Sequence, residues 1–214
     1  MRHLYLFSGL GADERAFQNL HFAGCQTHFI QWLPPRPKET ISQYAGRLAA
    51  QITTRDPVLI GLSFGGMVAA EVAKLVAAEK IILISSAKTK HELPPYYRLA
   101  GWLKLDQLMP AKAFIKPNRL NNWLFGCHNE DDRQLLAEIL QDTDPVFFKW
   151  AIGQIVRWRN TTVHPSLVHI HGSADRILPP LFVRADFTLQ NGGHFMVVNR
   201  AAEINHILGN QFKL

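Results

Sequence analysis

The sequence has little cysteine: Cys25 and Cys127 are the two in 214 residues, and neither lies in a CxxC pair. This scarcity excludes a disulfide-built scaffold and favours a reducing compartment. We expect no secretory leader either, because the apolar stretch after His3 is short and the charged residues Asp13 to Arg15 follow it closely. We therefore expect a cytoplasmic protein.

Long hydrophobic runs and basic clusters are also missing. The most apolar region, residues 67–87, contains four charged side chains, so we expect no membrane span. Lysine and arginine outnumber aspartate and glutamate by 23 to 17, which gives a formal net charge of +6, but the basic residues form no run. Proteins that bind nucleic acid usually carry a basic stripe, so we expect no nucleic-acid partner.

Motifs for cofactors and metals are absent too. Gly9 and Gly11 begin a G-x-G pattern, but Glu14 stands where a dinucleotide-binding fingerprint needs its third glycine. The histidines at positions 91, 128 and 164 do not have the spacing of metal ligands. We expect neither a cofactor nor a metal, and a small-molecule substrate as the partner.

Apolar segments and helical patterns alternate along most of the chain. Strands are predicted at 3–9, 27–33, 58–61, 80–87, 166–172 and 185–190. Helices are predicted at 14–20, 41–52, 65–78 and 200–212, with Asp13 and Thr40 as N-caps. The buried face of the helix over 65–78 is expected to hold Val68, Val72, Leu75 and Val76. Apolar strands joined by helical crossovers predict an α/β fold, with a six-stranded parallel sheet covered by helices on both faces.

Residues 88–165 interrupt this alternation. The stretch has a helical pattern, is rich in aromatic residues and is too long for an ordinary connection. We predict a core domain of residues 1–87 and 166–214, with residues 88–165 inserted as a helical cap. The aromatic side chains of the cap are expected to form a core of its own.

A serine stands at a sharp bend in LIGLSFGGMVAAEVAKL, residues 59–75. Gly61, Ser63 and Gly65 form a G-x-S-x-G pattern that follows an apolar strand and opens a helix, which is the context of a nucleophile elbow. Such a turn strains the serine backbone, and side chains two residues away on either side would collide. A serine that only caps a helix needs neither feature. We predict that Ser63 is a nucleophile.

A serine nucleophile needs a base and an acid, which follow it in such sheets in the order Ser, Asp or Glu, His. His194 lies in a glycine-flanked loop after the last predicted strand, whereas His206 lies on a helical face, so His194 is the predicted base. Asp175 directly follows a buried strand and is the predicted acid, whereas Asp186 lies within a predicted strand. The remaining aspartates are expected to be solvated positions of the cap: Asp106, Asp131, Asp132, Asp142 and Asp144.

Acyl transfer also needs two N–H donors for the negative charge that develops on the carbonyl oxygen. The Phe64 N–H is the first predicted donor, because it opens the helix next to the serine. The Leu10 N–H is the second, because Gly9 and Gly11 on either side allow the backbone to approach a substrate closely.

The segments FSGLGADERAF, GLSFGG, HGSADRILP and GGHF occur in the order found in the α/β-hydrolase superfamily, which the sequence resembles along nearly its whole length. The resemblance implies an α/β-hydrolase fold, a catalytic triad, an oxyanion hole and a cap inserted after the strand that follows the elbow. The chain departs from the superfamily in beginning at the third strand, which implies a minimal form. It also carries Ser8 where many members carry histidine.

Three functions remain open. The first is a carboxylic-ester hydrolase that works through an acyl-enzyme on Ser63. The second applies the same residues to a thioester, an amide or a carbon–carbon bond, or to a lyase-type reaction. The third is a non-catalytic receptor that binds a ligand in the pocket. Members of the fold that lose catalysis usually lose a triad residue, and all three are present here, which favours an enzyme.

Overall fold

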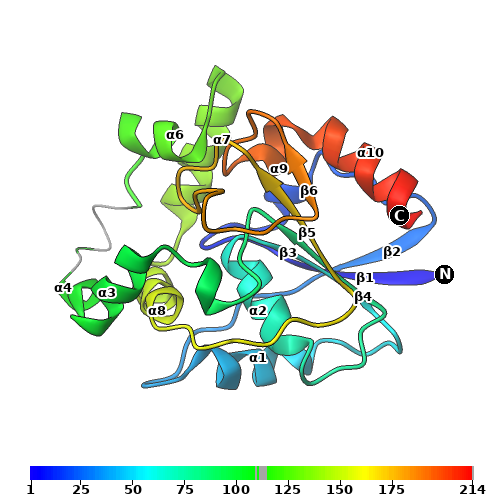
Figure 1. The fold of residues 1–214 in the computed structure, drawn as a ribbon, viewed down its shortest axis with the longest axis horizontal. Coiled ribbons are helices and arrows are strands. Elements are labelled where there is room, and N and C mark those ends of the chain that lie inside the picture. The colour runs from blue at the N-terminus through cyan, green and yellow to red at the C-terminus, as the bar shows by residue number, and fades with distance from the viewer. Residues whose placement is uncertain (109, 111–114, 214) are drawn as a thin grey trace.

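A parallel sheet forms the centre of the computed structural model, which describes residues 1–108, 110 and 115–213. It has six strands in the order β2-β1-β3-β4-β5-β6 (Figure 1). Each strand runs parallel to its neighbours. The strands are β1 (Arg2–Phe7), β2 (Cys25–Phe29), β3 (Val58–Leu62), β4 (Lys80–Ile84), β5 (Leu167–Gly172) and β6 (Phe187–Leu189). The predicted α/β fold with a six-stranded parallel sheet is confirmed.

Helices cover both faces of this sheet. Figure 1 shows α1 (Ile41–Ala49) and α2 (Phe64–Val72) on one face, and α9 (Met196–Asn199) and α10 (Ala201–Phe212) on the other. Thr40 caps α1 in a capping box with Gln43, and Asp13 caps the short 3₁₀ helix η1 (Glu14–Phe17), both as predicted. These caps satisfy N–H groups that a helix cannot pair by itself.

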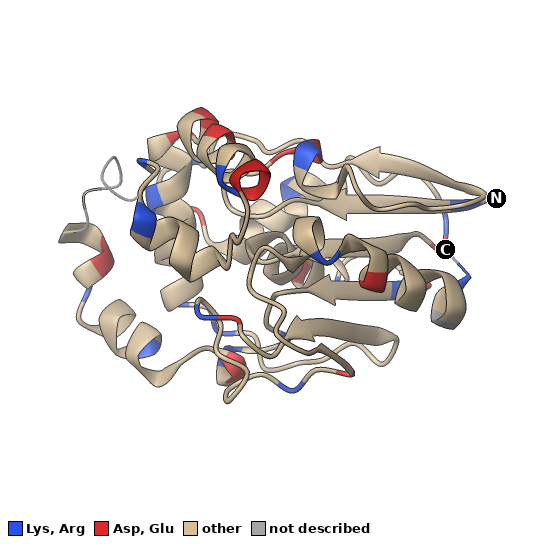
Figure 2. Ribbon diagram, turned by 90° about the horizontal axis from the view of Figure 1, so that it is seen from above, with Lys and Arg blue, Asp and Glu red and all other residues tan. Residues whose placement is uncertain are grey.

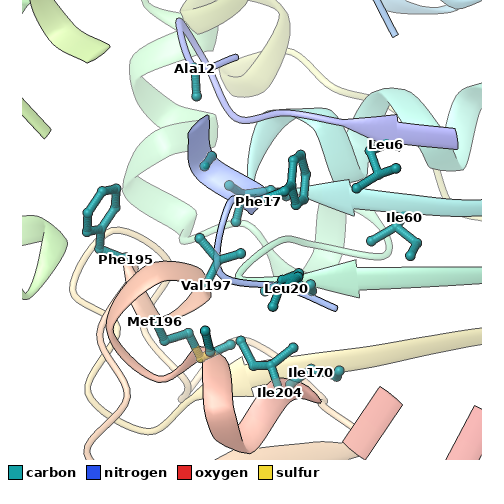
Figure 3. Packing of buried hydrophobic residues seen from close by; sticks show 14 of the residues in the cluster. Leu6, Ala12, Phe17, Leu20, Ile60, Ile170, Phe195, Met196, Val197 and Ile204 are labelled. Carbon is teal, nitrogen blue, oxygen red and sulfur yellow. The ribbon is translucent and has the colours of Figure 1, made fainter. Parts of the chain in front are cut away.

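Two hydrophobic clusters lie on opposite faces of the sheet, because alternate side chains of a strand point to opposite sides. On the α9–α10 side, strand residues such as Leu6 and Ile170 pack against Phe17, Met196 and Ile204 (Figure 3). On the other side, the remaining strand residues pack against α1 and α2. Burial on both faces explains why β1, β3 and β4 are almost continuously apolar in sequence.

The segment between β4 and β5 is helical, and most of it lies beside the carboxyl ends of the strands (Figure 1). Residues 109 and 111–114 of the predicted cap lie outside the described residues. The expectation that the cap aromatics form a core of their own is wrong for Phe147 and Trp158, which join the cluster on the α1–α2 side. The division into core and cap stays a prediction. The helices described between β4 and β5 are η2 (Lys90–Glu92), α3 (Pro95–Trp102), α4 (Leu105–Leu108), α6 (Arg119–Phe125), α7 (Glu130–Asp142) and α8 (Pro145–Val156).

Some predicted elements are shorter than expected. Strand β2 ends at Phe29 because its partner β1 ends at Phe7 and the register pairs Leu6 with Phe29. Helix α2 ends at Val72, where N–H groups begin to bond three residues back, and this places Leu75 in solvent instead of on the buried face. The helix predicted at 14–20 is only the 3₁₀ turn η1, and β6 has three residues.

The distribution of charge and the length of the helices bear on two exclusions made from the sequence. Figure 2 shows basic and acidic positions spread over several helices and loops. Within residues 1–108, 110 and 115–213, no helix combines the length and the apolar character that crossing a bilayer requires.

Candidate active site

Ser63 occupies the turn between β3 and α2 with φ 51° and ψ −121°, a conformation that non-glycine residues seldom adopt. The backbone on either side holds this strained turn in place. The Ser63 N–H donates to Ile84 O at 2.9 Å, while Ser63 O accepts from the Gly66 N–H at 3.0 Å and from Ser86 Oγ at 2.6 Å. The sequence pattern therefore folds into the predicted elbow.

The flanking glycines are needed for close backbone packing. A Cβ atom on Gly65 would lie 2.1 Å from Ser8 O, and one on Gly61 would lie 2.4 Å from Gly66 Cα. Real Cβ contacts are never so short, so α2 can approach the loop after β1 only with glycine at position 65. At position 65 the partner in the collision expected from the sequence is the backbone at the end of β1 and in the loop after it.

A continuous hydrogen-bond chain joins Ser63, His194 and Asp175. His194 Nε2 lies 2.8 Å from Ser63 Oγ, and His194 Nδ1 lies 2.7 Å from Asp175 Oδ2. The three residues follow β3, β5 and β6, whose carboxyl ends meet at one edge of the parallel sheet. The structure thus brings together the three side chains selected from the sequence.

The surroundings of Asp175 keep it anionic. Its Oδ1 accepts from the Ile177 and Leu178 N–H groups at 2.9 and 2.8 Å. Burial alone would raise the pKa of Asp175, but the neighbouring His194, His171 and Leu178 groups hold it below its ordinary value. An ionised carboxylate only accepts, so Nδ1–H of His194 donates to it, and Nε2 is left to accept the Ser63 hydroxyl proton.

His171 on β5 was not selected from the sequence. Its Nε2–H donates to Leu178 O at 2.9 Å, and the same nitrogen lies 3.7 Å from Asp175 Oδ2. The side chain is buried and supports the loop that carries the acid. The available signal was a pair of histidines in the otherwise apolar strand LVHIHG.

The two β5 histidines give folding a dependence on pH. Burial lowers the pKa of His171, and burial together with His171 and Lys88 lowers the pKa of His169 well below its ordinary value. The unfolded chain therefore takes up these protons first, so the stabilisation is complete above about pH 6.5 and decreases as pH falls.

We expect the free energy of unfolding to fall by up to about 1.4 kcal/mol per histidine for each pH unit below 6.5. His169→Gln should reduce this slope, and His206→Gln should not, because His206 is exposed on α10. Urea denaturation at pH 7.5 and 5.5 measures both differences. A His169→Gln slope equal to that of wild type would contradict the assignment.

The two predicted N–H donors border the serine. Phe64 is the first residue of α2, where N–H groups have no intrahelical acceptor. Leu10 lies in a turn closed by the Ala12 N–H, which donates to Gly9 O at 3.0 Å. A Cβ atom on Gly9 would lie 3.7 Å from Ser63 Cβ, so this turn runs alongside the elbow.

Helix α6 covers the loop that carries His194. Phe125 meets the imidazole edge to face with ring centroids 5.5 Å apart, and Phe125 O accepts from the Phe195 N–H at 2.8 Å. Arg176 reaches back from the acid loop and donates to Trp123 O at 2.7 Å. An aromatic cover of this kind limits water around the imidazole.

Two aspartates expected to be solvated are buried instead. Asp106 accepts from Arg157 Nη1 at 2.7 Å, and Asp132 accepts from Asn199 Nδ2 at 3.0 Å. Asp106 thus links α4 to the end of α8, and Asp132 links α7 to α9. Asp142 is exposed and pairs with Arg15 at 2.6 Å.

A model of the Alpha/beta hydrolase family matches residues 4–207. The chain belongs to the alpha/beta hydrolase family. The predicted resemblance to α/β-hydrolases is confirmed, and so is the prediction that the protein is an α/β-hydrolase enzyme, at the level of the family. A search of curated protein sequences found no match.

Solved structures of the alpha/beta hydrolase fold superimpose on nearly the whole chain. A thermophilic esterase from Thermogutta terrifontis has a TM-score of 0.70 and 15% identity, with 100% of this chain and 90% of that chain covered. A bromoperoxidase from Bacillus anthracis gives 0.67 and 15%, covering 100% and 92%. RedJ, a thioesterase from the prodiginine biosynthetic pathway in Streptomyces coelicolor, gives 0.65 and 18%, covering 96% and 84%. Identities this low show the fold alone.

Proposed function

We propose that this protein is a serine hydrolase that cleaves a small carboxylic ester through an acyl-enzyme on Ser63. The single observation that carries the proposal is the unbroken hydrogen-bond chain from Asp175 through His194 to Ser63, at 2.7 and 2.8 Å. A strained turn that presents one hydroxyl to a base and an oriented acid is the arrangement that activates a serine.

In the first half of the reaction, Ser63 Oγ attacks the ester carbonyl while its proton moves to His194 Nε2. Asp175 holds the imidazole in the required tautomer and stabilises the imidazolium. The Leu10 and Phe64 N–H groups donate hydrogen bonds to the carbonyl oxygen and stabilise the negative charge that develops on it. The carbon–oxygen bond to the alcohol then breaks, and the alcohol leaves with the proton from His194.

In the second half, water takes the place of the alcohol. His194 removes a proton from the water, whose oxygen attacks the acyl carbon. The bond to Ser63 Oγ breaks, Oγ takes the proton back from His194, and the carboxylic acid is released.

Residues 88–165 act as the cap in this proposal, since their helix α6 covers the loop that carries His194. A cytoplasmic location rests on the low cysteine content.

A thioester is the second candidate substrate, because the same chain of groups acts on it and the structural neighbours include a thioesterase as well as esterases. A panel of p-nitrophenyl esters, acyl thioesters and lactones of graded chain length tests both. We expect the highest kcat/KM on a short carboxylic ester. Hydrolysis confined to thioesters would replace the first candidate by the second, and no turnover with no labelling by a fluorophosphonate probe would favour a receptor.

A further inference from the structure

Two linked hydrogen bonds, one part-buried and one buried, lie beside the loop that carries Leu10. The indole Nε1–H of Trp32 donates to Ser8 Oγ at 2.8 Å, and the Ser8 hydroxyl donates to Ala12 O at 2.5 Å. Ser8 is 5% exposed, so its hydroxyl depends on these protein partners. The Ser8–Ala12 hydrogen bond joins the two ends of the turn, since Ser8 precedes the turn and Ala12 ends it.

Two further hydrogen bonds hold the turn between Ser8 and Ala12. It is closed by the Ala12 N–H to Gly9 O bond at 3.0 Å, with Gly11 at φ +71° as a type II turn requires. Thr143 Oγ1 adds a long contact to Gly11 O at 3.3 Å. The Ser8 hydroxyl therefore supplies the shortest bond across this turn.

Trp32 also contacts the other side of the site. Its ring centroid lies 5.9 Å from that of Phe64, the first residue of α2, and 5.5 Å from that of Phe147. The Tyr44 hydroxyl fixes the backbone next to Trp32, because it accepts from the Leu33 N–H at 2.9 Å and donates to Leu33 O at 2.8 Å. One immobilised indole thus touches both segments that carry the predicted N–H donors.

We propose that Ser8 and Trp32 are positioning residues that hold the Leu10 N–H in line with the Phe64 N–H. This rests on the proposed function. Neither side chain reaches the substrate: Trp32 orients the Ser8 hydroxyl, the hydroxyl fixes Ala12, and the turn between them sets the direction of the Leu10 N–H. Without the hydrogen bonds from Trp32 to Ser8 and from Ser8 to Ala12, the turn keeps the backbone bond from the Ala12 N–H to Gly9 O. The Leu10 N–H then loses its alignment with the developing oxyanion.

Ser8→Ala and Trp32→Phe test the proposal, because each breaks this series of hydrogen bonds and keeps most of the side-chain volume. We expect each to lower kcat on the best ester by about 10-fold or more and to leave KM within about twofold, since donors placed for the transition state act there and not in the ground state. The inhibition constant of an alkylboronic acid, which forms a tetrahedral adduct on serine, should rise by the same factor as kcat falls. The double variant should lose no more kcat than the more impaired single variant, because both changes break the same series of hydrogen bonds.

Trp158→Phe is the matched control. Trp158 is as buried as Ser8, and its Nε1–H donates to Glu71 Oε1 at 2.8 Å, away from the elbow loops. The Trp158→Phe variant loses an indole N–H hydrogen bond, as Trp32→Phe does. We therefore expect lower stability in urea denaturation with unchanged kcat and unchanged boronic acid affinity.

The outcomes separate the two proposals. A wild-type protein without ester turnover and without labelling of Ser63 overturns the proposed function. An active wild type whose Ser8→Ala and Trp32→Phe variants keep kcat and boronic acid affinity overturns the positioning role alone. A fall in kcat without a matching loss of boronic acid affinity overturns it too, because the effect then comes from something other than the donors. If Ser8→Ala fails to fold, Trp32→Phe decides between these results.

Discussion

Ser63→Ala should abolish labelling by a fluorophosphonate probe and lower kcat on short p-nitrophenyl esters by about 10⁴-fold or more. The reason is chemical, because alanine has no oxygen to attack the carbonyl and His194 then has no proton to receive. The backbone of the turn should persist, since it is held by Ile84 O and Ser86 Oγ and not by the Ser63 hydroxyl. Active-site labelling followed by steady-state kinetics on purified protein measures both effects.

The same loss is expected from the other two members of the hydrogen-bond chain. His194→Ala removes the base, and Asp175→Asn favours the wrong tautomer of His194 while Oδ1 keeps its two backbone donors, so kcat should fall by about 10⁴-fold with little loss of stability. Combining either change with Ser63→Ala should add almost nothing. Asp131→Asn is the matched control, because Asp131 is exposed on α7 and makes none of these contacts. Near wild-type turnover by His194→Ala or Asp175→Asn would show that the residue has been given the wrong role.

The elbow and its partners could be predicted because their signals are local. The turn at Ser63 requires glycines at fixed offsets, and a strand, a turn and a helix meet within a few residues. Asp175 and His194 lie far apart in sequence, but parallel strands bring their carboxyl ends to one edge of the sheet. Residues that follow different strands of a parallel sheet can therefore be predicted to lie close together.

Side-chain networks across the fold could not be predicted in the same way. The burial of Asp106 depends on Arg157, which is 51 positions away, and nothing near Asp106 in sequence signals a partner. The contact between Trp32 and Ser8 requires that β2 ends early and the chain turns inward, whereas the apolar pattern extends the strand past Trp32. Such contacts depend on tertiary packing, which periodicity does not encode.

Gly65→Ala should destabilise the fold by about 3 kcal/mol or more. The added Cβ would lie 2.1 Å from Ser8 O and 2.3 Å from Phe7 O. Both are backbone atoms of β1 and its loop, and β1 is paired with a strand on each side, so neither can move without disturbing the sheet. Urea denaturation at pH 7.5 measures the difference in the free energy of unfolding.

Gly46→Ala is the matched change in α1, and the opposite sign is expected for it. Gly46 is exposed, and the nearest atom to an added Cβ is Leu75 Cδ1 at 4.0 Å, an ordinary contact. Alanine restricts the unfolded chain and suits a helix better than glycine, so this variant should be more stable by about 0.5–1 kcal/mol. Because the two substitutions have the same chemistry, the difference between them isolates the packing of α2 against the loop after β1. Equal effects at the two positions would mean that the packing of α2 against the loop after β1 is looser than the structure shows.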